Sequence, residues 1–474
     1  DGQRQSSRPS QRPCQILHRV MYQSNEEVMA MADTVGRKTA RHVTAQEAAG
    51  LVASGMWLDF GFGICQPDEF DRALGARADE LNGVKIRSCI TLRPRAHHEA
   101  DPTGEHILSL NWHFSGYDRR QHDAGRCNYL PLNLGEWPDL YRRFVDRVDI
   151  AIFQVCPKDE NGLYNFSAAA SYHRALVDKA RMVILEVNPS FPYCHGKENS
   201  VHESEVDFII DGDGRSAAEL PDAITTDVDQ AIARLIAAEI KDGDCLQIGI
   251  GGLPNAVCRA VAQAGVKDLG INTEMMVEGL MELVKAGAAT GSRKQVDVGK
   301  AVYAFAIGSR ELYSYIDRNP AFETRAVDYT NLPHFVARND NVVAVNSTGQ
   351  MDLQGQAASE SSGHRHFSGT GGQLGFVRAA YQSNGGRAFL CMPSTHEKNG
   401  VRKSRVVLDF PGGTVVTVPR TDVMYAVTEY GIVCLKGKAV AERAKAMISI
   451  AHPDFREELE REAYNKGLIP SAFY

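Results

Sequence analysis

Two stretches far apart in the chain decide its fold: GMWLDFGFGICQPDEFDRAL at residues 55–74 and GDCLQIGIGGLPNAVCRAV at residues 243–261. Each contains a glycine, a short apolar run, a Gly-x-Gly turn and a proline just before a helical pattern. This order predicts a buried strand that ends in a tight glycine turn and leads into a helix. The offset of about 188 residues is far above the period of a solenoid, so we interpret it as a duplicated domain.

The composition excludes several classes of protein. The chain has 474 residues, 43% of them hydrophobic and 23% charged, which is enough for two or three globular domains. A net charge of −7 argues against a nucleic-acid-binding protein, and no apolar run approaches the roughly 18 residues of a membrane span. Ten cysteines without a C-x-x-C pair argue against a structural zinc site or a redox motif and indicate a reducing compartment, so we expect a cytoplasmic protein.

Apolar strands alternate with helical patterns along most of the chain, which is typical of parallel sheets covered by helices on both faces. We place a domain boundary near Pro221. Residues 1–40 would form a flexible tail and lead-in, residues 41–221 an N-terminal domain and residues 222–474 a C-terminal domain. The first 14 residues are rich in Arg, Ser, Gln and Pro, which predicts disorder; a flexible tail and a remnant of a targeting segment both fit.

Local signals predict individual elements. Thr44-Ala-Gln-Glu47 has the form of a capping box and predicts the start of a helix. Short runs of apolar, mostly β-branched residues predict strands, among them Ile150–Cys156, Met182–Val187 and Thr414–Val418.

Two glycine turns could bind a ligand, because ligands in open α/β sheets bind beyond the carboxyl ends of strands and at helix N-termini. The turn Gln247–Pro254 is either a packing turn or a ligand loop, and its proline stands where a dinucleotide fingerprint needs a third glycine. The segment Phe367–Gln373 has three glycines in four residues before a helix, which favours a ligand loop. Walker A and G-x-S-x-G motifs are absent from the sequence.

Three glutamates at predicted strand ends are candidates for an active-site carboxylate: Glu186, Glu274 and Glu429. Taken alone, each is either a paired structural carboxylate or a functional group. The pair His364 and His366 is either part of a polar loop or a contact for a metal or ligand.

Several phrases taken together resemble the acetyl-CoA hydrolase/transferase family of CoA-transferases, in particular its 4-hydroxybutyrate CoA-transferase and butyryl-CoA:acetate CoA-transferase branch. The match is dense from about residue 149 to 459 and sparse before it. The resemblance implies two tandem, duplicated open α/β CoA-transferase domains with mostly parallel sheets. The phrases, in chain order, are CPKDENG, EVNPSFPYCHGKENSVHESEVDFII, LQIGIGGLPNAV, DLGINTEMMVEGLMELVKAG, VDYTNLP, FSGTGGQLGFVRAA, TEYGIVCLKGK and IAHPDFREEL.

The resemblance also implies a site in the C-terminal domain. Glu274 falls on the family's catalytic nucleophile. Asn272 stands where the family usually has His, and Gly375 stands where it has Asp. The turn around the reacting carbonyl falls on Gln247, Gly249 and Gly251, and the CoA-binding loop falls on Ser368, Gly369, Gly371, Gly372 and Gln373.

The implied activity is that of an acyl-CoA:carboxylate CoA-transferase, which moves CoA between short-chain acids by a ping-pong reaction through a glutamyl-CoA thioester. Coenzyme A and acyl-CoA would be substrates, with no tightly bound cofactor and no metal. We expect an acyl-CoA and a carboxylate as partners, no nucleic acid, no membrane, and a homo-oligomer, either a dimer or a tetramer. Two alternatives stay open: an acyl-CoA hydrolase on the same scaffold, and a CoA-binding protein without turnover.

Overall fold

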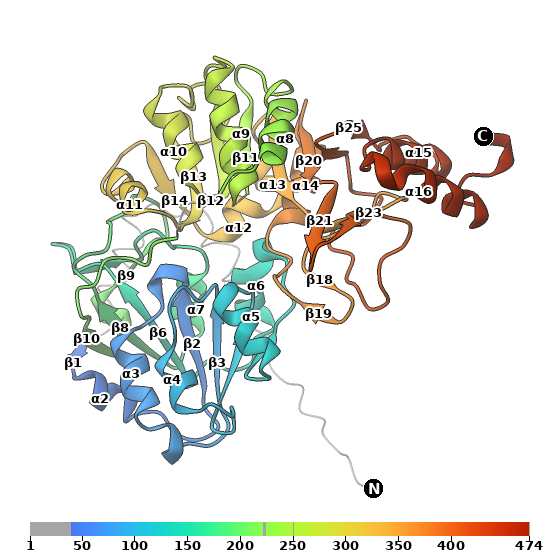
Figure 1. Cartoon of the computed structure of the whole chain (residues 1–474). Coiled ribbons are helices and arrows are strands. Elements are labelled where there is room, and N and C mark those ends of the chain that lie inside the picture. Colours follow the sequence, from blue (N-terminus) through green and yellow to red (C-terminus); the bar gives the residue numbers. More distant parts are fainter. Residues whose placement is uncertain (1–38, 221–223, 250, 474) are drawn as a thin grey trace, which may run out of the picture. The chain divides into compact units, whose positions relative to one another are not determined.

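The computed structural model describes residues 39–220, 224–249 and 251–473 (Figure 1). The segment for which the sequence predicts disorder lies outside the described residues, as does almost all of the predicted lead-in. The chain divides into two units, residues 1–39 and residues 40–474, and both large sheets belong to the second.

The N-terminal half of the described chain contains an eight-stranded sheet in the order β1-β10-β8-β6-β2-β3-β4-β5. All of its neighbouring strands are parallel, as the alternation of strands and helices predicts. The strands are β1 (Arg41–His42), β2 (Trp57–Phe62), β3 (Val84–Cys89), β4 (Ile107–Asn111), β5 (Cys127–Tyr129), β6 (Ile150–Val155), β8 (Met182–Val187) and β10 (Phe208–Asp211). The helices are α2 (Ala45–Ala49), α3 (Glu69–Gly75), α4 (Ala96–Ala100), α5 (Gly116–Asp123), α6 (Trp137–Arg143) and α7 (His173–Lys179), and a hairpin adds β7 (Leu163–Asn165) and β9 (Ser200–His202).

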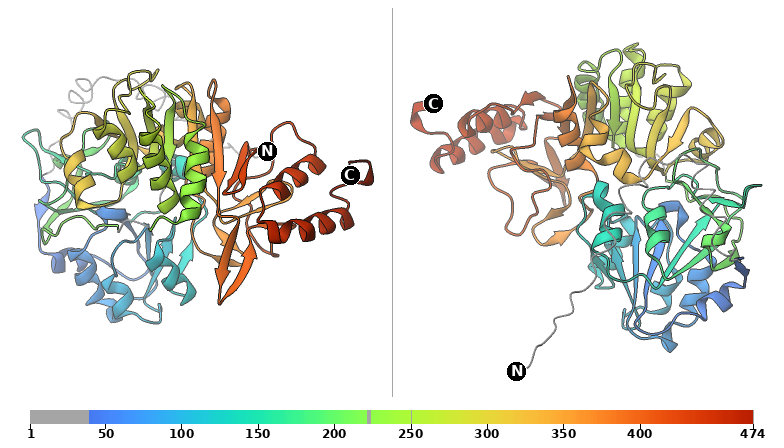
Figure 2. Two further views of the ribbon diagram at one scale, coloured as in Figure 1. Left: turned by 45° about the horizontal axis from the view of Figure 1, so that its top comes forward. Right: turned by 180° about the vertical axis from the view of Figure 1, so that it is seen from behind.

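The C-terminal half of the described chain contains a second eight-stranded sheet in the order β14-β13-β12-β11-β15-β20-β24-β25, parallel except for the last pair. Helices α15 and α16 pack against each other beside the edge strand β25 (Figure 2). The strands are β11 (Cys245–Ile248), β12 (Gly270–Met276), β13 (Ala301–Ala306), β14 (Phe322–Thr324), β15 (Val342–Ser347), β20 (Arg387–Cys391), β24 (Tyr425–Thr428) and β25 (Gly431–Cys434). The helices are α8 (Asp227–Ala237), α9 (Gly252–Gln263), α10 (Glu278–Lys285), α11 (Arg310–Ile316), α12 (Val327–Asn331), α13 (Pro333–Val336), α14 (Gln373–Gln382), α15 (Val440–Ser449) and α16 (Pro453–Asn465). Short strands outside the sheet are β16 (Gln350–Asp352), β17 (Ala357–Ala358), β18 (Ser361–Ser362), β19 (Arg365–His366), β21 (Thr395–Lys398), β22 (Val401–Ser404) and β23 (Val406–Val407).

Seven of the eight strands in each sheet have one topology, which confirms the duplicated α/β fold. Strands β5-β4-β3-β2-β6-β8-β10 correspond in order to β14-β13-β12-β11-β15-β20-β24. The eighth strands differ, because β1 comes first in the chain and is parallel to its neighbour, whereas β25 comes last and is antiparallel. The two stretches that first indicated duplication form β2 and β11, each followed in sequence by its neighbour in the sheet. Trp57 of β2 pairs with Lys85 of β3, and Cys245 of β11 pairs with Gly270 of β12. By this register, Cys89 of β3 occupies the position that Glu274 occupies in β12.

Most local predictions are confirmed, and one strand is wrong. The hydroxyl of Thr44 accepts a hydrogen bond from the N–H of Glu47 at 3.1 Å, which is the predicted capping box at the start of α2. Strand β8 has the predicted bounds. Residues 414–418 do not form a strand of either sheet: Val418 makes only an isolated bridge to Ala357, and the preceding valines are exposed on the surface.

The carboxyl ends of the two sheets meet in a shared core. Phe62 at the end of β2 packs against Phe305 near the end of β13, with ring centroids 4.4 Å apart. Trp137 of α6 stacks on Tyr172 at 3.8 Å in the same buried cluster. Loops that follow strands of either half can therefore contribute to one site. No helix among the described residues is long and apolar enough to cross a membrane.

Candidate active site

Glu274 lies near the carboxyl end of β12, where the two halves meet. The side-chain amide of Asn331 donates a hydrogen bond to its Oε2 at 2.6 Å, and the backbone N–H of Gly372 also hydrogen-bonds the carboxylate. Burial raises the pKa of Glu274 to about 7, although both donors act to lower it. The carboxylate is thus desolvated and held by uncharged donors, which suits a group that reacts as a nucleophile.

Asn331 was missed by the sequence analysis. It ends the short helix α12, and the hydroxyl of Thr330 donates to its Oδ1 at 2.8 Å. Because Oδ1 accepts that bond, the Nδ2 end of the amide is directed to Glu274. The residue belongs to the phrase VDYTNLP, but a neutral amide on a five-residue helix has neither a charge nor a periodic pattern that would single it out in the sequence.

The glycine loop of residues 368–372 lies directly against the carboxylate. A Cβ atom on Gly372 would overlap Oε2 of Glu274 and Nδ2 of Asn331, and one on Gly371 would lie 3.9 Å from Oε1. Gly371 also has a φ of +57°, a conformation that favours glycine. Helix α14 begins at Gln373, so its N-terminus follows immediately after the contact with Glu274. The structure therefore brings the predicted loop and the predicted nucleophile together.

The predicted turn follows β11, the neighbour of β12 in the sheet. The two strands are parallel and pair at Cys245–Gly270 and Leu246–Ile271, so the turn leaves β11 at the edge of the sheet that carries Glu274. Gln247 and Asn346 form a reciprocal pair of side-chain amides, with N–O distances of 3.2 and 2.9 Å. The N–H of Gly249 donates to the carbonyl of Val345 at 3.1 Å, so it already has a partner in this conformation.

The remaining predicted residues have mixed surroundings. Gly251 precedes helix α9 with a φ of +121°, which favours glycine. The side chain of Gln373 donates to the carbonyl of Ser347 at 2.9 Å, while its Oε1 is buried without a partner among the described residues. Ser368 contacts His113 of the N-terminal half at 3.1 Å, and a Cβ on Gly369 would lie 2.8 Å from the same imidazole.

Both departures from the family pattern meet at Asn331. Asn272 donates to the carbonyl of Thr330 at 3.0 Å and so anchors the end of α12. A Cβ on Gly375 would lie 3.0 Å from the backbone oxygen of Asn331. An Asp at 375 would press on this backbone, and a His at 272 would replace the anchor, so the two departures belong to one local arrangement.

The other strand-end glutamates have structural partners. Glu186 accepts hydrogen bonds from the backbone N–H groups at the start of α3, those of residues 68, 69 and 70, at 3.0 to 3.1 Å, and burial raises its pKa to about 7. Glu429 accepts from the N–H and hydroxyl of Ser394 at 2.8 and 2.6 Å. The ring of His366 stacks on Tyr129 with centroids 3.7 Å apart, which is a packing contact.

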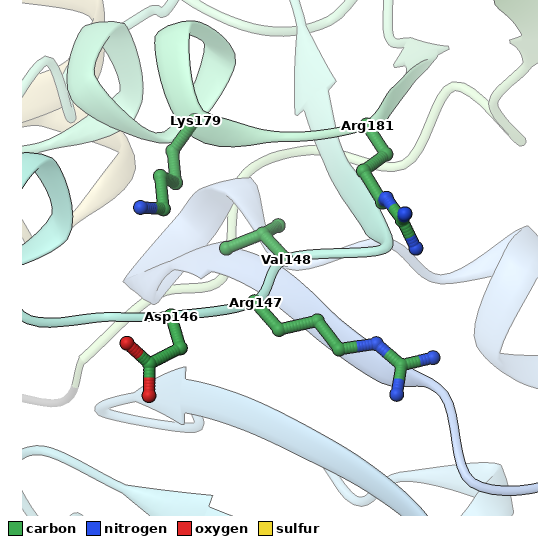
Figure 3. Close-up of a pocket in the computed structure, with 5 residues that line it drawn as sticks. All are labelled: Asp146, Arg147, Val148, Lys179 and Arg181. Atoms are coloured by element: carbon green, nitrogen blue, oxygen red, sulfur yellow. The ribbon is translucent and has the colours of Figure 1, made fainter. Parts of the chain in front are cut away.

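A surface hollow of about 470 Å³ lies elsewhere, beside the residues that precede β6 and β8 (Figure 3). It is at the amino ends of these strands, whereas Glu274 lies at a carboxyl end. Figure 3 shows Arg147 and Arg181 pointing to one side, and both pair with Asp149, at 2.6 and 3.3 Å. The other lining residues are Asp146, Val148 and Lys179. Because Asp149 already pairs with both arginines, we do not assign this hollow to the reaction.

Fold and site together define a two-domain α/β protein with a partly buried glutamate against a glycine loop, at the junction of duplicated sheets. The sequence profile of the acetyl-CoA hydrolase/transferase N-terminal domain matches residues 32–221, and that of the C-terminal domain matches residues 308–463. The chain belongs to the acetyl-CoA hydrolase/transferase family, as the sequence motifs predict.

Individual relatives cover nearly the whole chain. The butyryl-CoA:acetate CoA-transferase of Anaerostipes caccae is 43% identical, over 89% of this chain and 95% of the relative. The 4-hydroxybutyrate coenzyme A transferase of Clostridium kluyveri is 36% identical, over 89% of this chain and 96% of the relative. Among solved structures, RipA from Yersinia pestis aligns with a TM-score of 0.83 and 35% identity, over 90% of this chain and 98% of RipA.

Proposed function

We propose that this CoA-transferase family member moves CoA between short-chain carboxylic acids of the butyrate, acetate and 4-hydroxybutyrate type, through a glutamyl-CoA thioester on Glu274. The relatives named for these acids support the substrate class. The observation that carries the mechanism is the partly buried Glu274 carboxylate, held by the amide of Asn331 and the N–H of Gly372. The reaction needs no bound cofactor.

The proposed chemistry exchanges anions only. An Oε atom of Glu274 attacks the acyl-CoA carbonyl, the C–S bond breaks, and the thiolate leaves with the bonding pair, which gives a mixed anhydride. The thiolate then attacks the Glu274 carboxyl carbon, and the first acid leaves as a carboxylate. The resulting glutamyl-CoA thioester reacts with the second carboxylate by the same steps in reverse. Covalent catalysis divides the transfer into easier steps and keeps the thioester bond energy.

The surrounding groups have proposed roles in this scheme. Each tetrahedral intermediate carries an oxyanion that needs fixed donors, which typically contribute roughly 10²–10³ in rate each. We assign this role to the Gln247 side chain, whose NH₂ has a second hydrogen besides the one donated to Asn346. Because the N–H of Gly249 donates to Val345, we give Gly249 and Gly251 a shaping role in the turn. The loop Ser368–Gln373 would hold CoA close to Glu274.

A trapping experiment tests the proposal. The protein is incubated with butyryl-CoA alone, treated with borohydride, and digested for mass spectrometry of the peptide that contains residues 272–276. We expect Glu274 to be reduced to the alcohol, and Glu274→Gln to show no such product. Reduction at another carboxylate with Glu274 unmodified would move the nucleophile and overturn the mechanism.

The same preparation separates transfer from hydrolysis. CoA release from butyryl-CoA is followed with and without acetate, and acetyl-CoA is measured as the product. We expect acetyl-CoA with acetate and only slow CoA release without it. Fast release without acetate would favour the hydrolase alternative, in which water replaces the second acid.

A further inference from the structure

The glycine loop that contacts Glu274 belongs to the C-terminal half, but the N-terminal half holds it in place. Three hydrogen bonds between the halves reach three residues of the loop. They are Nε2 of His113 with Oγ of Ser368 at 3.1 Å, the N–H of Thr370 to the hydroxyl of Tyr129 at 3.1 Å, and the N–H of Leu134 to the carbonyl of Gly371 at 3.0 Å.

His113 is fixed by its own backbone. It follows strand β4, its N–H donates to Oδ1 of Asn111 at 2.9 Å, and its carbonyl accepts from the N–H of Ile90 at 3.0 Å. Ile90 has a φ of +48°, a conformation that a β-branched residue rarely adopts. Such strain persists only where the surrounding structure imposes it, and it is common beside functional sites.

The imidazole of His113 and the carboxylate of Glu274 both lie close to Gly371 of the loop. A Cβ atom on Gly371 would lie 3.5 Å from Cε1 of His113 and 3.9 Å from Oε1 of Glu274. Both side chains therefore lie within van der Waals distance of the place where a methyl group on Gly371 would be. A small movement of the imidazole would be transmitted through Gly371 to the neighbouring N–H of Gly372.

We propose that His113 is a positioning residue for CoA transfer: through Ser368 it holds the glycine loop so that the N–H of Gly372 stays on the Glu274 carboxylate. This inference rests on the proposed function, since it assigns Glu274 as the nucleophile. Burial, together with the neighbouring His366 and Arg119, lowers the pKa of His113 to about 4. The ring is therefore neutral at pH 7 and holds the loop without placing a cation beside the nucleophile.

The proposal has a consequence for the pH profile. The hydrogen bond from Gly372 acts to lower the pKa of Glu274, so weakening that bond raises it. More of the nucleophile is then protonated at pH 7, and the acid limb of kcat/KM moves to higher pH. Cys89, the titratable neighbour across the interface, stays a neutral thiol because burial and the charges of Asp118 and Glu274 raise its pKa well above the usual range.

The test compares His113→Phe, Ser368→Ala and the double variant over a range of pH. We expect each single variant to lose roughly tenfold to a hundredfold in kcat/KM, as displaced catalytic geometry does, with the acid limb shifted to higher pH. The double variant should lose no more than the worse single variant, because both break one contact. His113→Gln, which can still hydrogen-bond Ser368, should recover part of the activity.

His106→Phe is the matched control. His106 is also half-buried in the N-terminal half and bonds a backbone carbonyl, that of Leu81 at 2.7 Å, but it lies before β4 and away from the loop. If His113→Phe behaves like His106→Phe without a shift of the acid limb, or if the two losses multiply in the double variant, the proposal is overturned. Should His113→Phe fail to fold, Ser368→Ala probes the same bond from the other side.

Borohydride trapping on the wild type separates the two ideas. If Glu274 is labelled but the acid limb of kcat/KM is unchanged in the His113 and Ser368 variants, the positioning role is wrong and the proposed function remains. An unlabelled Glu274 would sink the proposed function first.

Discussion

Seven strands of each sheet share a topology, but the sheets differ at the carboxyl end of equivalent strands. Where β12 presents Glu274, the equivalent position in β3 holds Cys89, whose thiol is neutral and buried. The duplicated scaffold therefore has a carboxylate at only one of these two equivalent positions. In the N-terminal copy, the loop that follows strand β4 contacts the glycine loop beside Glu274.

The helices that follow β2 and β11 differ in the same way. The N-terminus of α3 is closed by the buried Glu186, which accepts three backbone N–H bonds. Helix α9 has no side-chain cap within the described residues and begins after Gly251. Helix N-termini attract anions. In the N-terminal copy the carboxylate of Glu186 occupies the N-terminus of α3, whereas in the C-terminal copy no carboxylate of the described residues caps the N-terminus of α9. A duplicated fold can thus have a single site, because a carboxylate of the protein occupies one of the two equivalent helix N-termini.

The largest effect on the rate should come from removing Glu274, the proposed nucleophile. We expect Glu274→Gln to lower kcat for butyryl-CoA:acetate exchange by roughly 10⁴-fold or more, since no other group replaces a covalent nucleophile. Cys89→Ala, the change at the equivalent position of the other sheet, should cost less than about tenfold. Comparable losses in both variants would contradict the division of roles between the copies.

Glu274→Gln should also be more stable than the wild type at alkaline pH. Burial raises the pKa of Glu274 from its usual value to about 7, so the folded state holds a proton that the unfolded state loses as pH rises from about 4.5 to 7. This carboxyl therefore destabilises the fold progressively across that window. We expect the free energy of unfolding of Glu274→Gln, measured by denaturant titration, to exceed that of the wild type by about 1–2 kcal/mol at pH 8 and to differ little from it at pH 5.

A smaller effect on the reaction should follow from the amide partner of Glu274. Asn331→Ala removes the 2.6 Å donor, so we expect a loss of roughly 10²–10³ in kcat and an acid limb of kcat/KM at higher pH. The check is a pH–rate profile beside Asn319→Ala, since Asn319 donates to a backbone carbonyl, that of Tyr315, after α11. An unchanged acid limb in Asn331→Ala would remove this donor from the mechanism.

Glu186 should matter for stability and not for chemistry. Glu186→Ala leaves three N–H groups at the start of α3 without their acceptor, so we expect a loss of about 1–3 kcal/mol in unfolding free energy. The turnover per folded molecule should stay within about twofold of wild type, by active-site titration with borohydride. A large loss of turnover in fully folded protein would mean that the N-terminus of α3 takes part in the reaction.

The sequence predicted the parts of this molecule that repeat or run apolar. The duplicated stretches, β8 and the glycine loop follow from local patterns. Strand β3 was overlooked because it carries the buried Arg87, whose charge is balanced by Asp59 at 2.7 Å, a partner that no local pattern reveals. His113 and Asn331 were missed for the same reason. The contact of His113 joins loops of different domains, and that of Asn331 joins helix α12 to strand β12, so neither follows from a local pattern.

Among the residues around Glu274, the smallest loss of kcat/KM should come from Gly375, the glycine that departs from the family pattern. A Cβ on Gly375 would lie 3.0 Å from the carbonyl oxygen of Asn331, which is tight but can be relieved by a shift of a few tenths of an ångström. We expect Gly375→Ala to change kcat/KM by about threefold to tenfold, since displaced positioning groups act on the rate through geometry. The effect should be lost when Asn331→Ala is already present, because both act through one amide. Additive losses would show that residue 375 reaches the substrate by another route, for example through Asn133, whose Oδ1 would lie 3.7 Å from the same Cβ.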